Sequence, residues 1–141
     1  MHTETAHAAE APAGVLAMMV AANGRIDERE LRVLDELDAF RRIGVSRDRF
    51  VEMARACLKD VGARLCEKSW LRASDVLYLD RLLDEVRDPN QRLLVCRLAA
   101  AVITADGRVS ADEQMVYGHV LARWHVSQTM VSHAILNDRT H

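Results

Sequence analysis

The residue types that most often carry chemistry are spread along this sequence without forming a catalytic motif. Cys57, Cys66 and Cys96 lack the C-x-x-C spacing of zinc and redox sites. His119 and His125 are six residues apart, whereas two metal ligands on one helix face need a spacing of three or four. No glycine-rich phosphate loop, nucleophile elbow or supported pair of carboxylates is present. The sequence therefore predicts a protein without an enzyme active site and without a bound cofactor.

An acidic loop suggests an alternative interpretation, in which the chain binds a divalent cation. Asp106, Asp112 and Glu113 lie in the segment D-G-R-V-S-A-D-E, which is similar to the second half of an EF-hand loop. The first half does not fit, because Val102 stands at the first position and offers no side-chain oxygen to a hard cation. An EF-hand calcium site is not expected. A looser, weak divalent-cation site built from the three acidic residues is left open.

The acidic loop belongs to an internal repeat. The segment A-N-G-R-I-D-E-R-E of residues 22–30 returns as A-D-G-R-V-S-A-D-E at residues 105–113, an offset of 83 residues from Asn23 to Asp106. Each copy follows an apolar helix and opens an amphipathic one, and a Val-Ser step that could start a further helix follows at residues 45–46 and 126–127. The match extends over about thirty residues per copy. It predicts a pseudo-repeat of helix, loop, helix, loop, helix.

Helix capping explains most of this repeat. Glycine adopts positive φ without a Cβ penalty, as the end of a helix often requires. Asp or Ser followed three residues later by Glu forms a capping box, which satisfies the free backbone N–H groups of a helix start. We therefore assign a structural loop or cap role to Asn23, Gly24, Asp27, Glu30, Gly107 and Ser110. Glu113 completes the second capping box in this interpretation and is a cation ligand in the alternative one.

The elements that position these loops are all predicted to be helices. Apolar residues recur mostly at helical spacing from Pro12 onward, and runs of alternating β-branched or aromatic residues are absent. The segment 89–105 carries only Arg92 and Arg97 as charges, so it is expected at the centre of the fold. About seven helices are expected, at residues 13–22, 28–41, 47–61, 75–86, 89–105, 111–124 and 128–136.

The chain is expected to form one domain. At 141 residues, half of them apolar, it is long enough to close a single hydrophobic core. Residues 1–11 have no apolar periodicity and are predicted to be a disordered leader. Residues 12–141 are predicted to form an all-α, single-domain bundle.

A row of acidic residues follows one predicted helix. Asp80, Asp84 and Asp88 are spaced four residues apart, and like charges at this spacing repel. Such a row could be kept for a basic partner or a cation, or it could be neutralised by Arg81 and Arg87. We interpret it as a solvated face, because exposed charges usually do no more than this.

Bulk composition narrows the partners and the location. A formal net charge of -2 gives no excess positive field to hold a phosphate backbone, so nucleic acid is not an expected partner. The uncharged apolar stretch of residues 12–22 is too short to span a bilayer, which leaves only peripheral membrane association through a partner. An odd number of cysteines without a framework spacing favours a reducing compartment, and we expect the cytoplasm.

The two A-[DN]-G-R-[IV]-x-x-x-E loops resemble those of the TerB-like, tellurite-resistance-associated domain family, over residues 14–136. The resemblance implies a helical bundle, and it implies cation binding and resistance to toxic oxyanions as family associations. Asp106 and Glu113 match the acidic positions of the family, whereas Asn23 stands where Asp is usual. Similar domains occur in DnaJ-type cochaperones and other bacterial stress proteins, which implies an accessory interaction module.

The expected function is therefore a cytoplasmic, non-enzymatic interaction module of a bacterial stress-response system of the tellurite-resistance type. A protein partner is expected, and weak cation binding at the acidic loops is left open. The alternative is a dedicated divalent-metal-binding protein.

Overall fold

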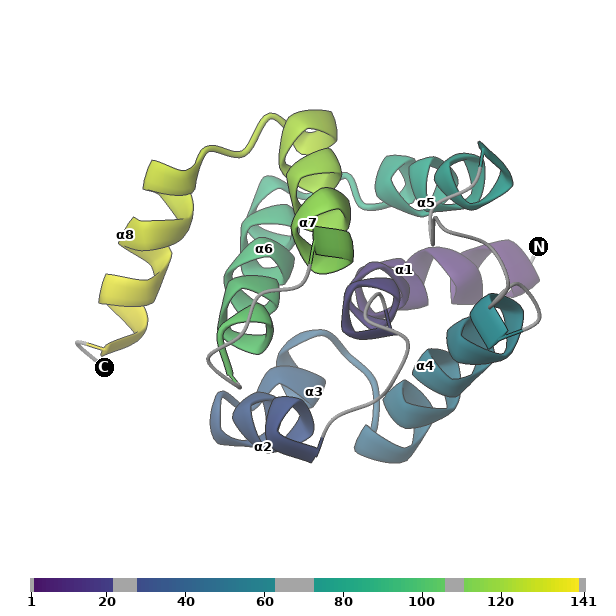
Figure 1. Ribbon diagram of the computed structural model, residues 1–141, viewed down its shortest axis with the longest axis horizontal. Helices are drawn as coiled ribbons and strands as arrows, with labels where there is room; N and C mark the ends of the chain where they lie inside the picture. Colours follow the sequence, from purple (N-terminus) through teal and green to yellow (C-terminus); the bar gives the residue numbers. More distant parts are fainter. Residues whose placement is uncertain (1, 22–27, 63–72, 106–110, 140–141) are drawn as a thin grey trace.

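The computed structural model describes residues 2–21, 28–62, 73–105 and 111–139. Over these ranges the chain forms eight α-helices and no β-strand, which confirms the expected all-helical class (Figure 1). The helices are α1 (His2–Ala21), α2 (Glu28–Glu36), α3 (Ala39–Arg42), α4 (Arg47–Gly62), α5 (Ala73–Glu85), α6 (Pro89–Ile103), α7 (Ala111–Trp124) and α8 (Gln128–Arg139).

Several helix ends coincide with the capping residues in the sequence. Helix α7 has the bounds expected from periodicity, and α6 begins at residue 89 as expected, with Pro89 at its first position, where the missing N–H of proline costs no hydrogen bond. The Asp88 carboxylate accepts a hydrogen bond from the backbone N–H of Asn90 at 2.9 Å, so Asp88 is the N-cap of α6.

The single helix expected at residues 28–41 is wrong, because the chain breaks at Asp38 and forms α2 and α3. Asp38 is left-handed, with φ 56° and ψ 34°, and its carboxylate accepts a hydrogen bond from Arg41 Nε at 2.6 Å. The break turns Phe40 back into the core, where its ring lies 5.3 Å from that of Phe50. Burial of Phe40 therefore offsets the loss of helical continuity, and the helix count becomes eight.

Helix α1 also differs from the sequence expectation. It begins at His2, so the segment 1–11 expected as a disordered leader is helical from that residue onward. Glu10 accepts two hydrogen bonds from the Arg49 guanidinium, at 2.8 and 2.9 Å, and Ala11 is 1% exposed. The hydrogen bonds and charge of Glu10 raise the pKa of Arg49. A bidentate contact to α4 thus supports the helix before Pro12.

Helices α1 and α6 form the centre of the fold. Helix α1 packs against α4, α5, α6 and α7, while α6 packs against α1, α2, α7 and α8. Figure 1 shows α1 between the pair α4 and α5 and the pair α6 and α7. Every residue of the segment 11–21 is buried. The central position expected for residues 89–105 is confirmed, and α1 shares it.

Small residues allow the close approach of helices around α1. A Cβ atom at Gly14 would lie 3.4 Å from Leu82 Cδ1 of α5 and 3.7 Å from Met53 Cε of α4. A larger side chain at this position would therefore push α4 and α5 away from α1.

The residues between α3 and α4 end the first helix and cap the start of the second. The backbone N–H of Val45 donates to Phe40 O at 3.0 Å, and Gly44 has a φ of 80°. Ser46 Oγ accepts a hydrogen bond from the N–H of Arg49 at 3.0 Å, which makes Ser46 the N-cap of α4.

The junction between α7 and α8 has the same pattern. The N–H of Val126 donates to Leu121 O at 3.0 Å, and His125 has a φ of 54°. Ser127 Oγ accepts from the N–H of Met130 at 3.1 Å and caps α8. The two Val-Ser steps therefore start helices as expected, and His125 takes the place that glycine has in the first junction.

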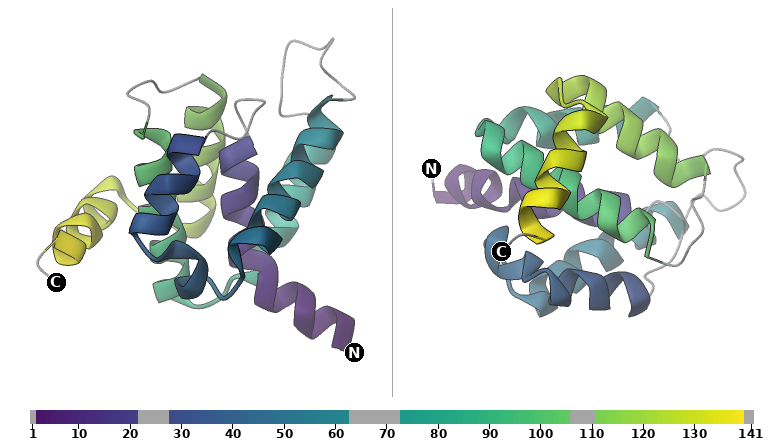
Figure 2. Two further views of the ribbon diagram at one scale, coloured as in Figure 1. Left: turned by 90° about the horizontal axis from the view of Figure 1, so that it is seen from below. Right: turned by 90° about the vertical axis from the view of Figure 1, so that its left-hand side faces the viewer.

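Helix α8 lies at the edge of the molecule, where it crosses over α6 (Figure 2). It packs on the core through Val131, which is 1% exposed, and the partly buried Ile135. Among the described residues, no helix has the length and apolar character that a membrane span requires.

Candidate functional site

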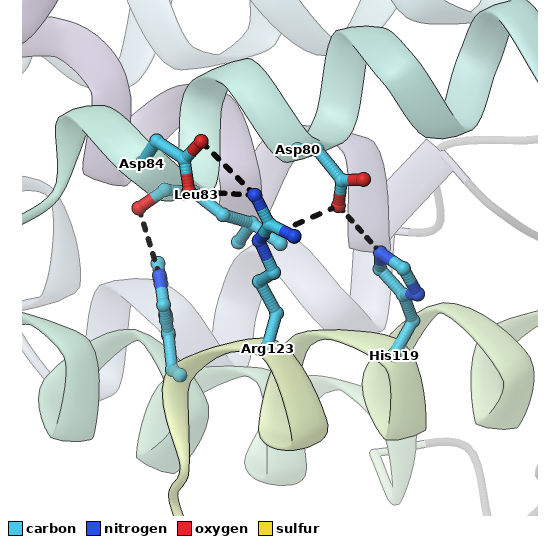
Figure 3. Close-up of polar contacts among 6 residues, drawn as sticks. Asp80, Leu83, Asp84, His119 and Arg123 are labelled. Atoms are coloured by element: carbon cyan, nitrogen blue, oxygen red, sulfur yellow. Dashed lines mark hydrogen bonds and ion pairs between the residues drawn. The ribbon is translucent and has the colours of Figure 1, made fainter.

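Four polar side chains connect α5 to α7 (Figure 3). His119 Nε2 lies 2.7 Å from Asp80 Oδ1, and Arg123 Nη2 lies 3.0 Å from both carboxylate oxygens of Asp84. Arg123 Nε is also 4.0 Å from the same oxygen of Asp80. We call these four residues the α5–α7 clasp.

The clasp accounts for the acidic row in the sequence. Asp80 and Asp84 pair with side chains of α7, and Asp88 caps α6. The partners of Asp80 and Asp84 are His119 and Arg123, which are distant in sequence, and not the neighbouring arginines. A purely solvated face is therefore the wrong description, since the side chain of Asp80 is only 23% exposed.

The clasp contains an Asp–His pair, which in hydrolases orients the imidazole for proton transfer. Such a pair needs a nucleophile or substrate group within hydrogen-bond reach of the histidine. In the structure, this pair forms a contact between α5 and α7.

Trp124, the last residue of α7, contacts α5 and α6 at one end of the bundle. Its Nε1 donates to Leu83 O at 2.9 Å, and the side chain is buried. The Arg92 guanidinium lies 5.9 Å from the Trp124 ring centroid, and Arg92 Nε donates to Val86 O at 2.6 Å. These contacts fix the end of the bundle from which α8 departs.

A groove lies between α6 and α8 and encloses about 430 Å³. This volume is within the range of about 300–1,000 Å³ that is typical of binding pockets. Its apolar lining residues are Leu93, Leu94, Met130 and Ala134. Its polar lining residues are Arg42, Asn90, Arg97, Thr129, His133 and Asn137. We call this feature the α6/α8 groove.

The two helices contribute the same pattern of residues to the groove. The lining positions of α6 are 90, 93, 94 and 97, and those of α8 include 130, 133, 134 and 137. Both sets have the spacing i, i+3, i+4, i+7, which places each set on one helix face. No sequence motif indicates this groove, and the repeated spacing is the feature from which it could have been suspected.

Two arginines contribute to the lining of the groove. Arg42 of α3 and Arg97 of α6 both line it, and none of the described lining residues is acidic. Arg42 Nη1 donates to Leu37 O at 3.3 Å, which helps to orient the guanidinium from the break between α2 and α3. Arg97 is only 7% exposed, so its charge acts in surroundings from which most water is excluded.

Most residues assigned from the loop repeat lie outside the described part of the chain. These are Asn23, Gly24, Asp27, Asp106, Gly107 and Ser110. Asp112 and Glu113 lie in the first turn of α7, and their side chains are also outside it. Glu30 is described and is buried, at 1% exposed, in the first turn of α2. Helices α2 and α7 begin directly after the expected cap positions.

The histidines of α7, of the α7–α8 junction and of α8 lie at three separate places in the described part of the chain. No group of three His, Cys, Asp or Glu side chains there has the arrangement of a metal site. His119 belongs to the clasp, His125 to a helix junction and His133 to the groove.

Cys96 is fully buried in α6, as expected for a thiol in apolar helical surroundings. Burial raises the pKa of Cys96 to about 12, so the thiol stays protonated and unreactive at neutral pH. Burial, together with the nearby Cys96, raises the pKa of Tyr117 to about 12, against the lowering effect of the hydrogen bond from its hydroxyl to Gln128 Oε1. These groups are part of the core.

Comparison with models of protein families, with curated proteins and with solved structures finds no match to this chain. A function for the α6/α8 groove therefore has to be inferred from its lining residues and its shape.

Proposed function

We propose that this chain is a non-enzymatic interaction module of a bacterial stress-response system, with a TerB-like architecture, and that it docks a helix of a partner protein in the α6/α8 groove. The observation that carries the proposal is the groove itself, which lies between two helix faces of equal spacing and is lined by both apolar and polar side chains. Grooves of this kind receive the apolar face of an amphipathic helix.

The TerB-like architecture is supported by the two loop sequences and by the likeness of the two helix junctions. Both junctions have the same hydrogen bond from the valine N–H, a residue of positive φ and a serine cap. A duplicated unit would produce such a correspondence. Placement in the cytoplasm and in a stress response follows from the family resemblance and from the cysteine pattern.

A docked helix would cover apolar side chains that are partly exposed in the free chain. Met130 on α8 is 43% exposed, and Leu93 and Leu94 on α6 are only partly buried. Covering these side chains removes apolar surface from water, at about 25 cal/mol per Å². The partner helix would lie in the groove, in contact with both α6 and α8.

A charge-neutral blocking variant tests the docking site. Ala134→Trp should fill the groove, whereas Ala122→Trp adds the same ring to an exposed position on α7. Helical peptides selected from a displayed library against the wild-type chain should bind Ala122→Trp normally and Ala134→Trp much more weakly. Circular dichroism would check that both variants fold, and Met130→Gln serves as a second groove variant. Equal binding to the wild type and to a folded groove variant would refute the proposal.

A further inference from the structure

We propose that Met130 is a site of reversible oxidation, and that a peroxide acting on its thioether weakens docking in the α6/α8 groove. The inference rests on the proposed function and adds a form of regulation at the same groove. Met130 lines the groove and is 43% exposed, so a small oxidant can reach its side chain in the free chain.

The other described methionines differ from Met130 in burial or in position. Met18 and Met19 lie in the buried part of α1, and Met53 of α4 is packed against the core. Met115 of α7 has the same exposure as Met130, 43%, but does not line the groove. Met115 and Met130 should therefore react with an oxidant to a similar extent, whereas only oxidation of Met130 changes the groove.

The reaction is an oxygen transfer from hydrogen peroxide to the sulfur of Met130. The sulfur lone pair attacks one peroxide oxygen, an S–O bond forms and the O–O bond breaks. The other oxygen leaves as water with both protons of the peroxide. The thioether is thereby oxidised to a sulfoxide while the peroxide is reduced, and methionine sulfoxide reductases reverse the change.

The sulfoxide alters the apolar part of the groove. A thioether is apolar and adaptable, whereas a sulfoxide is polar and accepts hydrogen bonds from water. The other apolar lining residues are Leu93, Leu94 and Ala134, so Met130 supplies one of four apolar side chains. The apolar face of a docked helix would displace water from the sulfoxide without replacing its hydrogen bonds, which makes docking less favourable.

The test uses hydrogen peroxide and a helical peptide selected against the wild-type chain from a library without methionine or cysteine. Mass spectrometry of proteolytic fragments should show an added oxygen at Met115 and Met130, and much less at Met18 and Met19. Fluorescence anisotropy should give an affinity for the peptide about tenfold lower after oxidation. Treatment with methionine sulfoxide reductases should restore the affinity.

Two matched variants assign the effect to one residue. For each variant, the affinity after peroxide treatment is compared with that of its own untreated sample. Met130→Leu should remove the loss of affinity, and Met115→Leu should keep it in full, because Met115 lies outside the groove. Saturation with the peptide should slow the oxidation of Met130 and leave that of Met115 unchanged.

The outcomes separate this inference from the docking function. Unchanged affinity of a chain oxidised at Met130, or an equal loss of affinity in Met130→Leu, would overturn the inference and keep the docking function. Oxidation of Met115 without oxidation of Met130 would overturn it as well. Equal peptide binding by the wild type and by folded Ala134→Trp would overturn the docking function, and with it the inference.

Discussion

Gly44 and His125 occupy corresponding positions in the two helix junctions and share the left-handed backbone conformation, with φ of 80° and 54°. Each is followed by a Val-Ser pair whose serine caps the next helix. Glycine adopts this conformation freely, whereas histidine has a Cβ that crowds the backbone. The second junction is therefore strained where the first is not.

Replacing His125 by glycine should stabilise the protein. The left-handed conformation costs a non-glycine residue about 1–2 kcal/mol, and the greater freedom of glycine in the unfolded chain cancels part of the gain. We expect a net increase of about 0.5 kcal/mol in the free energy of unfolding, measured by urea denaturation. Gly44→Ala is the converse control and should destabilise by about 1 kcal/mol, since open space around Gly44 leaves only the backbone strain. A destabilised His125→Gly would show that the imidazole makes a contact that outweighs the strain.

The two carboxylates of the clasp should differ in their contribution to stability. Asp80 is 23% exposed and lies 2.7 Å from His119, whereas Asp84 is 63% exposed in its pair with Arg123. We expect Asp80→Asn to lower the free energy of unfolding by about 1 kcal/mol and Asp84→Asn by about 0.5 kcal/mol or less. Thermal unfolding at pH 7 gives the comparison. A larger loss of stability in Asp84→Asn than in Asp80→Asn would contradict the larger contribution that we assign to the less exposed carboxylate.

The fold class and most helix positions could be predicted from the sequence, because caps and periodicity are local. Helix α7 has its expected bounds, and α6 begins at residue 89, where the segment 89–105 was expected to start. The break at Asp38 could not be predicted in this way, since it depends on the packing of Phe40 against Phe50. The contact between Glu10 of α1 and Arg49 of α4 likewise has no local signal, because the two residues are 39 positions apart in sequence.

The groove could not be found by a motif search. Arg42, Arg97 and His133 come from three helices, and only tertiary packing brings them to one cavity. Each is an unremarkable residue in its own helix. The repeated i, i+3, i+4, i+7 spacing in α6 and α8 marks a helix face, but the same spacing is present in any amphipathic helix. The interpretation of the acidic row as a solvated face was also wrong, because the side chains that pair with Asp80 and Asp84 lie on α7.

The buried thiol of Cys96 should make stability fall at alkaline pH. Its pKa is raised from about 9 in the unfolded chain to about 12 in the folded chain, so the folded state holds the proton more tightly. The contribution of Cys96 to the free energy of unfolding is complete below pH 9 and is lost as the pH rises toward 12. Cys96→Ala should therefore reduce the slope of the free energy of unfolding against pH in this window, although Tyr117 keeps part of it. Cys57→Ala is the control, as Cys57 is only partly buried, and an identical slope in both variants would contradict the assignment.

The central claim is that a partner helix binds in the α6/α8 groove, and chemical-shift mapping tests it most directly. A helical peptide selected against the wild-type chain is titrated into the isotope-labelled chain, and the backbone amide resonances are followed. We expect the largest shifts at Leu93, Leu94, Met130 and His133, which line the groove, with little change at Asp84 and Arg123 of the clasp. Ala134→Trp should reduce these shifts at a fixed peptide concentration. Shifts centred on the clasp, or shifts at the groove that are unchanged in Ala134→Trp, would contradict the account.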